Sequence, residues 1–548
     1  MRIKNNATIV RARSYSGNRK ADITYGIDDV PPWYLCLFMA LQHYLTMIGA
    51  IVSIPFILTP ALCMAEDDPA RSYIISTMIF VTGLVTLLQT TLGCRLPLVQ
   101  GGTISFLVPT LAILNLPQWK CPAPEILNEM STENRTELWQ IRMRELSGAI
   151  AVSAMFQVIV GFGGNSQSFA TLLKPPLNIG VLTILMLTTY SHIMVNVSVP
   201  IPVYRKGHGL QIIWFELFKL FPVLLTIVVM WAICAILTVT DTLPVGHPAR
   251  SDSKIKIISD SPWFRVPYPG QWGVPTVTLS GVLGMLAGVL ACTVESISYY
   301  PTTSRMCGAP PPPVHAINRG IGIEGLGTVL AGLWGSGNGT NTFGENVGTI
   351  GVTKVGSRRV IQWACGLMIL QGLISKFGAV FIIIPEPIIG GIFCVMFGMI
   401  CAFGLSALQY VDLNSARNLY ILGFSIFFPL VLSKWMIKHS DAIQTGNDVV
   451  DGVVTVLLST TILVGGGLGC LLDNIIPGST AERGLDAWSK EMELNMDVKE
   501  EDENAEYVPN TFDFPIGMSV LRRWKWTSYV PFLPTYRPRP FGCRSKKQ

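Results

Sequence analysis

Apolar runs long enough to cross a lipid bilayer recur along most of this chain, and they restrict its fold more than any other feature. Half of the 548 residues are hydrophobic, only 14% are charged, and the mean hydropathy is +0.45. A soluble domain usually carries about 25% charged residues. Because the bilayer interior offers the backbone no water, runs of about 20 apolar residues form helices there. We therefore expect an all-α, multi-pass membrane protein.

Two of the candidate spans are interrupted. The spans are 33–58, 73–94, 97–116, 146–164, 177–198, 215–240, 273–298, 320–335, 341–353, 360–384, 387–409, 417–436 and 451–472. Gly101 and Gly102 break the third span, and the ninth lies in a stretch rich in glycine, asparagine and threonine that carries Glu345. Irregular backbone at membrane depth is tolerated only inside protein or beside a watery cavity. Paired interruptions therefore predict a transporter site built from half-helices.

Charge patterning orients the chain. The segment 1–30 is polar and basic, so we expect the amino terminus in the cytoplasm. The loop 117–145 holds the glycosylation acceptor Asn134 and should lie outside. Cys63 and Cys121 both fall in expected exterior loops and could pair there. Beyond Pro477 the chain turns polar, and 477–548 is expected to be a solvated, partly disordered cytoplasmic tail.

Several motifs, spread between about Val30 and Pro534, resemble the nucleobase–ascorbate transporter family. They are Gln42-His43, the run Leu96–Thr103, Glu295-Ser296-Ile297, the run Gly308–Gly320 and Glu345-Asn346 with the residues up to Lys354. The chain looks closest to the animal, sodium-coupled branch of the family. The resemblance implies two inverted repeats of seven spans, a core domain, a gate domain and a homodimer in the plasma membrane.

On this resemblance the domains fall into three parts. The segment 1–30 precedes the transporter domain 31–476, and 477–548 follows it. Within the transporter domain, the core would use about 33–164 and 273–410, and the gate about 177–240 and 417–472.

The resemblance also implies a substrate site. Glu295 and Glu345 would each grip a nucleobase, while the backbone around Ser105, Phe106 and Gly344 would meet its carbonyl oxygens at half-helix starts. Supporting or ion-coupling candidates are Gln42, His43, Ser298, Asn338, Thr342 and Asn346. One alternative stays open, in which Glu295 is a structural acid paired with Gln42, His43 or Asn346. Glu324 is expected to be structural.

The residue at position 345 bears on the substrate. Vitamin C carriers of the family have Ser-Ser-Pro-Asn where this chain has Phe343-Gly-Glu-Asn346, whereas nucleobase members keep the glutamate. A carboxylate accepts hydrogen bonds from ring N–H groups but would oppose the ascorbate anion. We therefore expect uptake of uracil, thymine, xanthine, hypoxanthine or guanine, with ascorbate less favoured.

The chain departs from the family pattern at Asn165–Pro176. The family has two spans between Gly164 and the basic loop at Arg205, but only 177–198 is apolar enough here. One span cannot join two cytoplasmic loops, so the fifth span, a gate span, is expected to be missing. The alternative function is thus an impaired or non-transporting variant.

Other function classes fit less well. The chain shows no nucleophile–base set and no metal-ligand cluster, which argues against an enzyme. We expect no cofactor and no nucleic-acid partner, with Na⁺ as the coupling ion.

Overall fold

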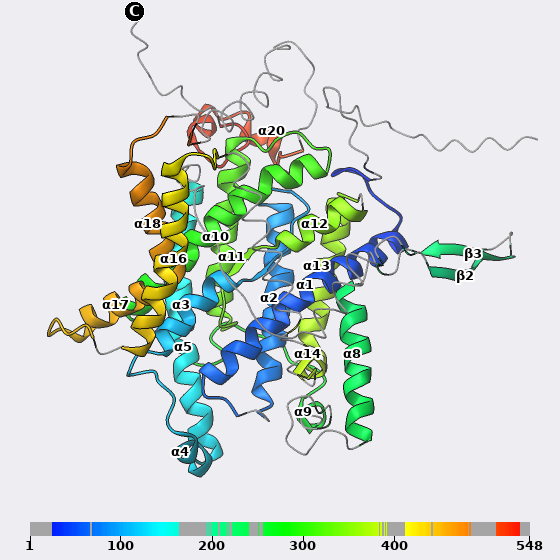
Figure 1. Cartoon of the computed structure of the whole chain (residues 1–548). Helices are drawn as coiled ribbons and strands as arrows, with labels where there is room; N and C mark the ends of the chain where they lie inside the picture. The colour runs from blue at the N-terminus through cyan, green and yellow to red at the C-terminus, as the bar shows by residue number, and fades with distance from the viewer. Residues whose placement is uncertain are drawn as a thin grey trace, which may run out of the picture.

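The helices of this chain form a bundle, with α4 (Pro124–Glu129) at one end and α20 (Met518–Leu521) at the other (Figure 1). The computed structural model describes residues 23–163, 199–205, 209–215, 222–240, 250–382, 411–479 and 511–536, apart from positions 24, 66–67, 251, 253–255, 354 and 440–441. It also describes the isolated positions 194, 197, 218, 384–385, 388, 391 and 482–483.

Long apolar helices dominate these residues. In the described part of the chain four helices are long and apolar enough to span a membrane, or six if each of two bent pairs is one span. The four are α2 (Ala70–Thr91), α5 (Thr132–Phe162), α10 (Leu279–Met306) and α16 (Ala416–Lys438). The expected multi-pass helical membrane architecture is confirmed at this level.

The core is built from helices that are distant in sequence. The remaining long helices are α1 (Trp33–Ala61), α8 (Pro222–Val239), α11 (Val314–Leu333) and α13 (Arg358–Leu373). Helix α5 packs along α11, and α2 packs along α13. A Cβ atom on Gly161 would lie 2.1 Å from the backbone nitrogen of Gly322, so α5 and α11 can approach this closely only because glycine occupies the contact.

The paired interruptions form two strand–helix units. Strand β1 (Gln100–Gly102) leads into α3 (Ile104–Leu114), and β4 (Thr340–Thr342) leads into α12 (Gly344–Thr353). The two strands pair antiparallel, with Gly101 opposite Asn341. The strands satisfy each other's backbone groups inside the bundle, which is the condition for irregular backbone at membrane depth.

Two of the expected spans each divide into two helices with a sharp bend between them. The segment 360–384 divides into α13 and α14 (Ser375–Ile382), which meet at 84°. The segment 451–472 divides into α17 (Asp448–Ser459) and α18 (Thr461–Ile475), which meet at 77°. At the second bend Thr460 is extended and its hydroxyl donates to the Val456 carbonyl, a local bond that competes with the helix ladder.

The region of the expected gap is only partly described. A hairpin of β2 (Val199–Arg205) and β3 (Gly209–Phe215) precedes the expected span 215–240 and overlaps it only at Phe215; it projects from the bundle in Figure 1. The helical part of that span starts later, at Pro222 in α8. The expected loss of a span within 165–198 and the expected span 387–409 fall outside the described residues.

One end of the bundle carries a disulfide. Cys63 and Cys121 are bonded, which confirms the pairing considered from their positions. The same end holds the short helices α4 (Pro124–Glu129) and α9 (Lys256–Asp260). Asn134 lies there too, exposed in the first turn of α5.

At the opposite end the terminal segments pack onto the bundle. Tyr25 bridges to Val355, and the amide of Arg358 donates to the Ile27 carbonyl. The segment 511–536 contains α20 (Met518–Leu521) and the 3₁₀ turn η5 (Lys525–Tyr529). Phe512 is fully buried in a cluster with residues of α10, α11 and α12. Part of the expected solvated tail is therefore ordered.

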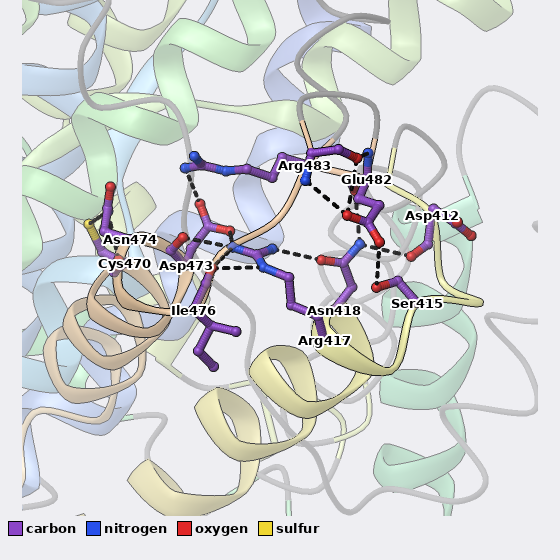
Figure 2. Close-up of polar contacts among 11 residues, drawn as sticks. Asp412, Ser415, Arg417, Asn418, Cys470, Asp473, Asn474, Ile476, Glu482 and Arg483 are labelled. Carbon is purple, nitrogen blue, oxygen red and sulfur yellow. Dashed lines mark hydrogen bonds and ion pairs between the residues drawn. The ribbon is translucent and has the colours of Figure 1, made fainter.

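A polar cluster ties α16 to the end of α18 (Figure 2). The Arg417 guanidinium donates to the Asp473 carboxylate at 2.7 Å and to the carbonyls of Asp473 and Ile476. Arg483 binds the other Asp473 oxygen at 2.7 Å. Since the last carbonyls of a helix have no partner within it, Arg417 acts as a cap for α18.

Candidate functional site

The site forms where the two strand–helix units meet. Thr103 caps α3 by accepting from the Ser105 amide at 3.3 Å, and its own amide donates to Asn338 Oδ1 at 2.8 Å. Asn338 thus joins the segment before β4 to the start of the first half-helix. A Cβ on Gly339 would fall 2.3 Å from the ring of Phe106, so only glycine allows this fully buried ring to lie against the strand.

Glu295 enters the site from α10 and is held by the second strand unit. Asn341 donates from Nδ2 to Glu295 Oε2 at 2.5 Å, and the Tyr299 hydroxyl lies 3.4 Å from Oε1. The alternative pairing of Glu295 with Gln42, His43 or Asn346 is therefore wrong. Asn341 and Tyr299 were missed from the sequence, because their pairing depends on how β4 crosses α10.

Behind Glu295 lies a second, fully buried carboxylate, that of Glu324 on α11. It accepts from the Ser296 hydroxyl at 2.7 Å, from Gln157 Nε2 at 2.9 Å and from the Thr342 hydroxyl at 3.2 Å. Its hydrogen bonds are satisfied by side chains of α5, α10 and β4, so its expected structural role fits this environment.

Ser296 joins the two carboxylates. Its hydroxyl lies 2.6 Å from Asn341 Oδ1 and 2.8 Å from Glu324 Oε1. Thr342 takes a hydrogen bond from Gln100 Nε2 at 2.8 Å, which ties the network to β1. The side chain of Thr342 therefore faces this internal network, where it supports the site from behind.

Glu345 stands in the first turn of α12, half-buried, and its carboxylate bonds no other side chain within the described residues. It interacts electrostatically with Glu295 across the packed pair α10 and α12. A carboxylate near a helix N-terminus is favoured by the helix dipole. The two sequence-predicted acids thus stand on helices that pack together, α10 and α12.

Next to Glu345, Asn346 fixes the first helix of the bundle. Its Nδ2 donates to the His43 carbonyl at 2.9 Å and lies 3.2 Å from His43 Nδ1. His43 is buried, as expected for an orienting residue. Gln42 Oε1 and Asn346 Oδ1 are buried and lack a hydrogen-bond partner among the described residues. A cation, a water molecule or a donor group of a solute would satisfy these two acceptors.

The remaining candidates differ in their fit. Gly344 is buried, and a Cβ there would lie 2.3 Å from the Tyr299 hydroxyl, consistent with close packing at the start of α12. The Phe106 amide donates to the Thr103 carbonyl at 3.3 Å, inside the first turn of α3. Ser298 is exposed, and its hydroxyl donates to the Glu295 carbonyl of its own helix at 2.6 Å.

Comparison with known proteins identifies the family. Residues 36–438 match the model Xan_ur_permease, described as a permease family. The chain belongs to this permease family. The mouse (Mus musculus) protein "Solute carrier family 23 member 1" is 43% identical over 94% of this chain and 90% of its own length. "Nucleobase-ascorbate transporter 1" of Arabidopsis thaliana is 34% identical over 86% of this chain and 92% of its own. The predicted kinship with nucleobase–ascorbate transporters is confirmed.

One solved structure is also similar. The structure of SLC26A9 aligns with a TM-score of 0.42 at 11% identity, over 80% of this chain and 65% of that one.

As a member of this permease family the chain is a multi-pass membrane transporter for a small solute. Two acids close together inside a membrane protein are costly unless a partner offsets their charge or they share it through hydrogen bonds. Glu295 has Asn341 and Tyr299 as partners, whereas Glu345 depends on what enters the site. The site is therefore suited to a solute rich in hydrogen-bond donors, or to a cation.

Proposed function

We propose that this permease is a sodium-coupled symporter of nucleobases such as uracil, thymine, xanthine, hypoxanthine or guanine. The observation that carries the proposal is that Glu345, at the start of α12, and Glu295, on α10, stand on two helices that pack together. A relative whose name includes both nucleobase and ascorbate leaves the substrate class open between these two.

The two acids favour the nucleobase. The edge of a uracil or xanthine ring offers N–H groups, and a carboxylate that accepts from them forms a charge-assisted hydrogen bond. Such bonds contribute about 1.5–3 kcal/mol each. Ascorbate is an anion and would meet two carboxylates with like charge.

The coupling ion would use oxygen acceptors close to the same half-helix. Gln42 Oε1 and Asn346 Oδ1 are two of the buried oxygens that have no hydrogen-bond partner among the described residues. Sodium is a hard cation, and hard cations take oxygen ligands. An ion there would lie beside Glu345, because Glu345 directly precedes Asn346 in α12. The positive charge of the ion would favour the same conformation of α12 that binds the solute.

The proposal includes the cellular arrangement. The symporter would lie in the plasma membrane as a homodimer, with both termini in the cytoplasm and the disulfide and Asn134 outside. A core domain that carries the site would move against a gate that includes α16, α17 and α18.

Uptake measurements in expressing cells test the proposal. Radiolabelled uracil, xanthine and ascorbate are compared with and without sodium, with surface abundance measured for every variant. Glu295→Gln and Glu345→Gln should each lower apparent affinity about 10–150-fold, the equivalent of one lost charged hydrogen bond. Glu133→Gln, an exposed acid in the first turn of α5, is the matched control and should have no effect. Saturable ascorbate uptake without competition from nucleobases would refute the substrate class.

A second candidate rests on the sequence between Asn165 and Pro176. If a gate span is absent there, the chain would be a non-transporting or impaired variant whose site binds a base without moving it. Equilibrium binding of uracil to purified protein, combined with absent uptake at normal surface abundance, would favour this candidate.

A further inference from the structure

The segment 511–536 forms a rigid platform on the end of the bundle opposite α4 (Figure 1). Arg319 Nη2 donates to the Phe512 carbonyl at 2.8 Å, and its guanidinium stacks over the ring of Phe514 at 4.6 Å. Arg358 donates to the Thr511 carbonyl at 2.9 Å. These bonds fix the start of the segment to α11 and α13.

The far end of the segment is fixed as well. Asn318 Nδ2 donates to the Pro531 carbonyl at 3.2 Å, and the rings of Phe162 and Phe532 meet edge to face at 4.8 Å. Thr527 is buried and its hydroxyl donates to the Leu521 carbonyl at 2.9 Å. The side chains between these anchors are therefore held in place on an ordered backbone.

Between the anchors the platform presents a basic–aromatic patch, which we define as Ile516, Val520, Arg523, Trp524, Lys525 and Trp526. All six side chains are exposed, Ile516 by 87%, Trp524 by 56% and Trp526 by 54%. The two tryptophan rings lie 5.8 Å apart. Asp513, the acid beside the patch, lies 3.7 Å from the Arg522 guanidinium.

We propose that the basic–aromatic patch is a binding site for anionic lipid headgroups of the cytoplasmic leaflet. Arg523 and Lys525 complement the negative surface of that leaflet, which attracts juxtamembrane cations. Tryptophan is the side chain enriched at membrane–water interfaces, where its ring is apolar and its N–H is hydrated. The patch lies where α11 begins and α5 ends, which is the level of the headgroups for helices that span the bilayer.

The lipid contact has a consequence for the transporter core. The anchors Asn318 and Arg319 belong to α11, and Arg358 belongs to α13. A headgroup bound to the patch would therefore be connected to α11, which carries Glu324, and to α13, which follows the helix that carries Glu345. The assignment uses the cytoplasmic placement proposed above, but lipid binding by purified protein can be measured without any uptake.

Limited proteolysis in nanodiscs tests the site, because Arg523 and Lys525 are themselves trypsin cleavage points. The full chain is placed in phosphatidylcholine alone or in phosphatidylcholine with phosphatidylserine. Phosphatidylserine should slow cleavage at 523–525 by about fivefold per cation, or roughly 25-fold, relative to cleavage at the exposed Lys120 on the other end. Added salt should remove this protection because it screens the attraction.

Two double variants distinguish lipid binding at the patch from a general effect of surface charge. Arg523→Glu with Lys525→Glu should lower the number of phosphatidylserine molecules retained in native mass spectrometry, and Trp524→Ser with Trp526→Ser should reduce the protection from trypsin. The matched control is Lys434→Glu with Lys438→Glu. These two exposed cations lie near Trp435 at the C-terminal end of α16. Unchanged thermal melting in phosphatidylcholine shows that each variant is folded.

Three results would overturn the proposal. One is equal cleavage at 523–525 in both lipids. Another is equal loss of phosphatidylserine in the control variant. The last is equal protection by soluble inositol hexakisphosphate in phosphatidylcholine nanodiscs, which would assign the patch to phosphate in general and not to a bilayer.

Discussion

Asn341 donates from Nδ2 to Glu295 Oε2 at 2.5 Å, so β4 holds the carboxylate that α10 contributes to the site. The same amide accepts from Ser296 through Oδ1 at 2.6 Å. One side chain on a three-residue strand thereby sets the position of the acid on a long helix. Position 341 should accordingly control both stability and solute affinity.

Replacing Asn341 by Asp places two carboxylates in contact. We expect Asn341→Asp to lose a charged hydrogen bond, about 1.5–3 kcal/mol, and to lower solute affinity by at least about tenfold. In Asn341→Asp with Glu295→Gln the bond re-forms with its direction reversed. Thermal melting should then recover while affinity stays low. If both the melting temperature and the solute affinity recovered, it would not matter for binding whether the negative charge lies on residue 295 or on residue 341.

Glu324 should act on folding more than on affinity. Glu324→Ala removes the buried acceptor of the Thr342 hydroxyl and the Gln157 amide, whereas the Ser296 hydroxyl keeps Asn341 Oδ1 as an acceptor. The expected loss is about 2–5 kcal/mol, seen as lower melting temperature and lower surface abundance. Glu324→Gln keeps an acceptor oxygen and should fall between wild type and alanine. Normal melting of the alanine variant would contradict this role.

The Cys63–Cys121 disulfide should stabilise the end of the bundle that carries α4. It joins positions separated by 58 residues, and its removal is expected to cost about 2–4 kcal/mol. Cys63→Ser, Cys121→Ser and the double variant should melt alike, since each loses the same bond. In Cys63→Ser the remaining thiol, that of the half-buried Cys121, should react with a membrane-impermeant maleimide on intact cells. Labelling only after permeabilisation would place this end in the cytoplasm instead.

The cap on α18 predicts a ranking of three variants. Arg417 binds both the Asp473 carboxylate and the carbonyls of Asp473 and Ile476, whereas Arg483 binds the carboxylate. Arg417→Ala should therefore destabilise most, by about 1–3 kcal/mol, followed by Asp473→Asn and then Arg483→Ala. Lys438→Ala, at the other end of α16, is the control. An equal effect of Arg417→Ala and Arg483→Ala would mean that the carbonyl contacts contribute little.

The gap at Asn165–Pro176 predicts a gain of transport. An apolar span of about 25 residues inserted after Gly164 should raise uptake and surface delivery, because it restores the parity that the basic loops require. Glycan maturation at Asn134 reports delivery independently of uptake. A polar insertion of the same length is the control. Equal uptake with and without the apolar insertion would show that the native 165–198 segment already forms a competent gate.

The tertiary structure supplied the partners within the site. The sequence identified Glu295 and Glu345, since an acid within an apolar segment is rare enough to stand out. Asn341, Tyr299 and Ser296 carry no such signal. Their contacts arise because β4 crosses α10 and pairs with β1, which lies about 240 residues earlier in the chain. A contact between distant segments depends on packing, which local periodicity does not encode.

What the sequence alone determined are the features with a local physical cause. Long apolar runs become helices because the bilayer leaves the backbone no other partner, and the glycines at 101–102 and within 335–339 interrupt the helical pattern. The tertiary structure alone decided the bends at Ile374 and Thr460, the cap formed by Arg417 and the docking of Phe512. The cap and the docking each stabilise one segment through a neighbour from elsewhere in the chain, so they exist only once the helices have packed.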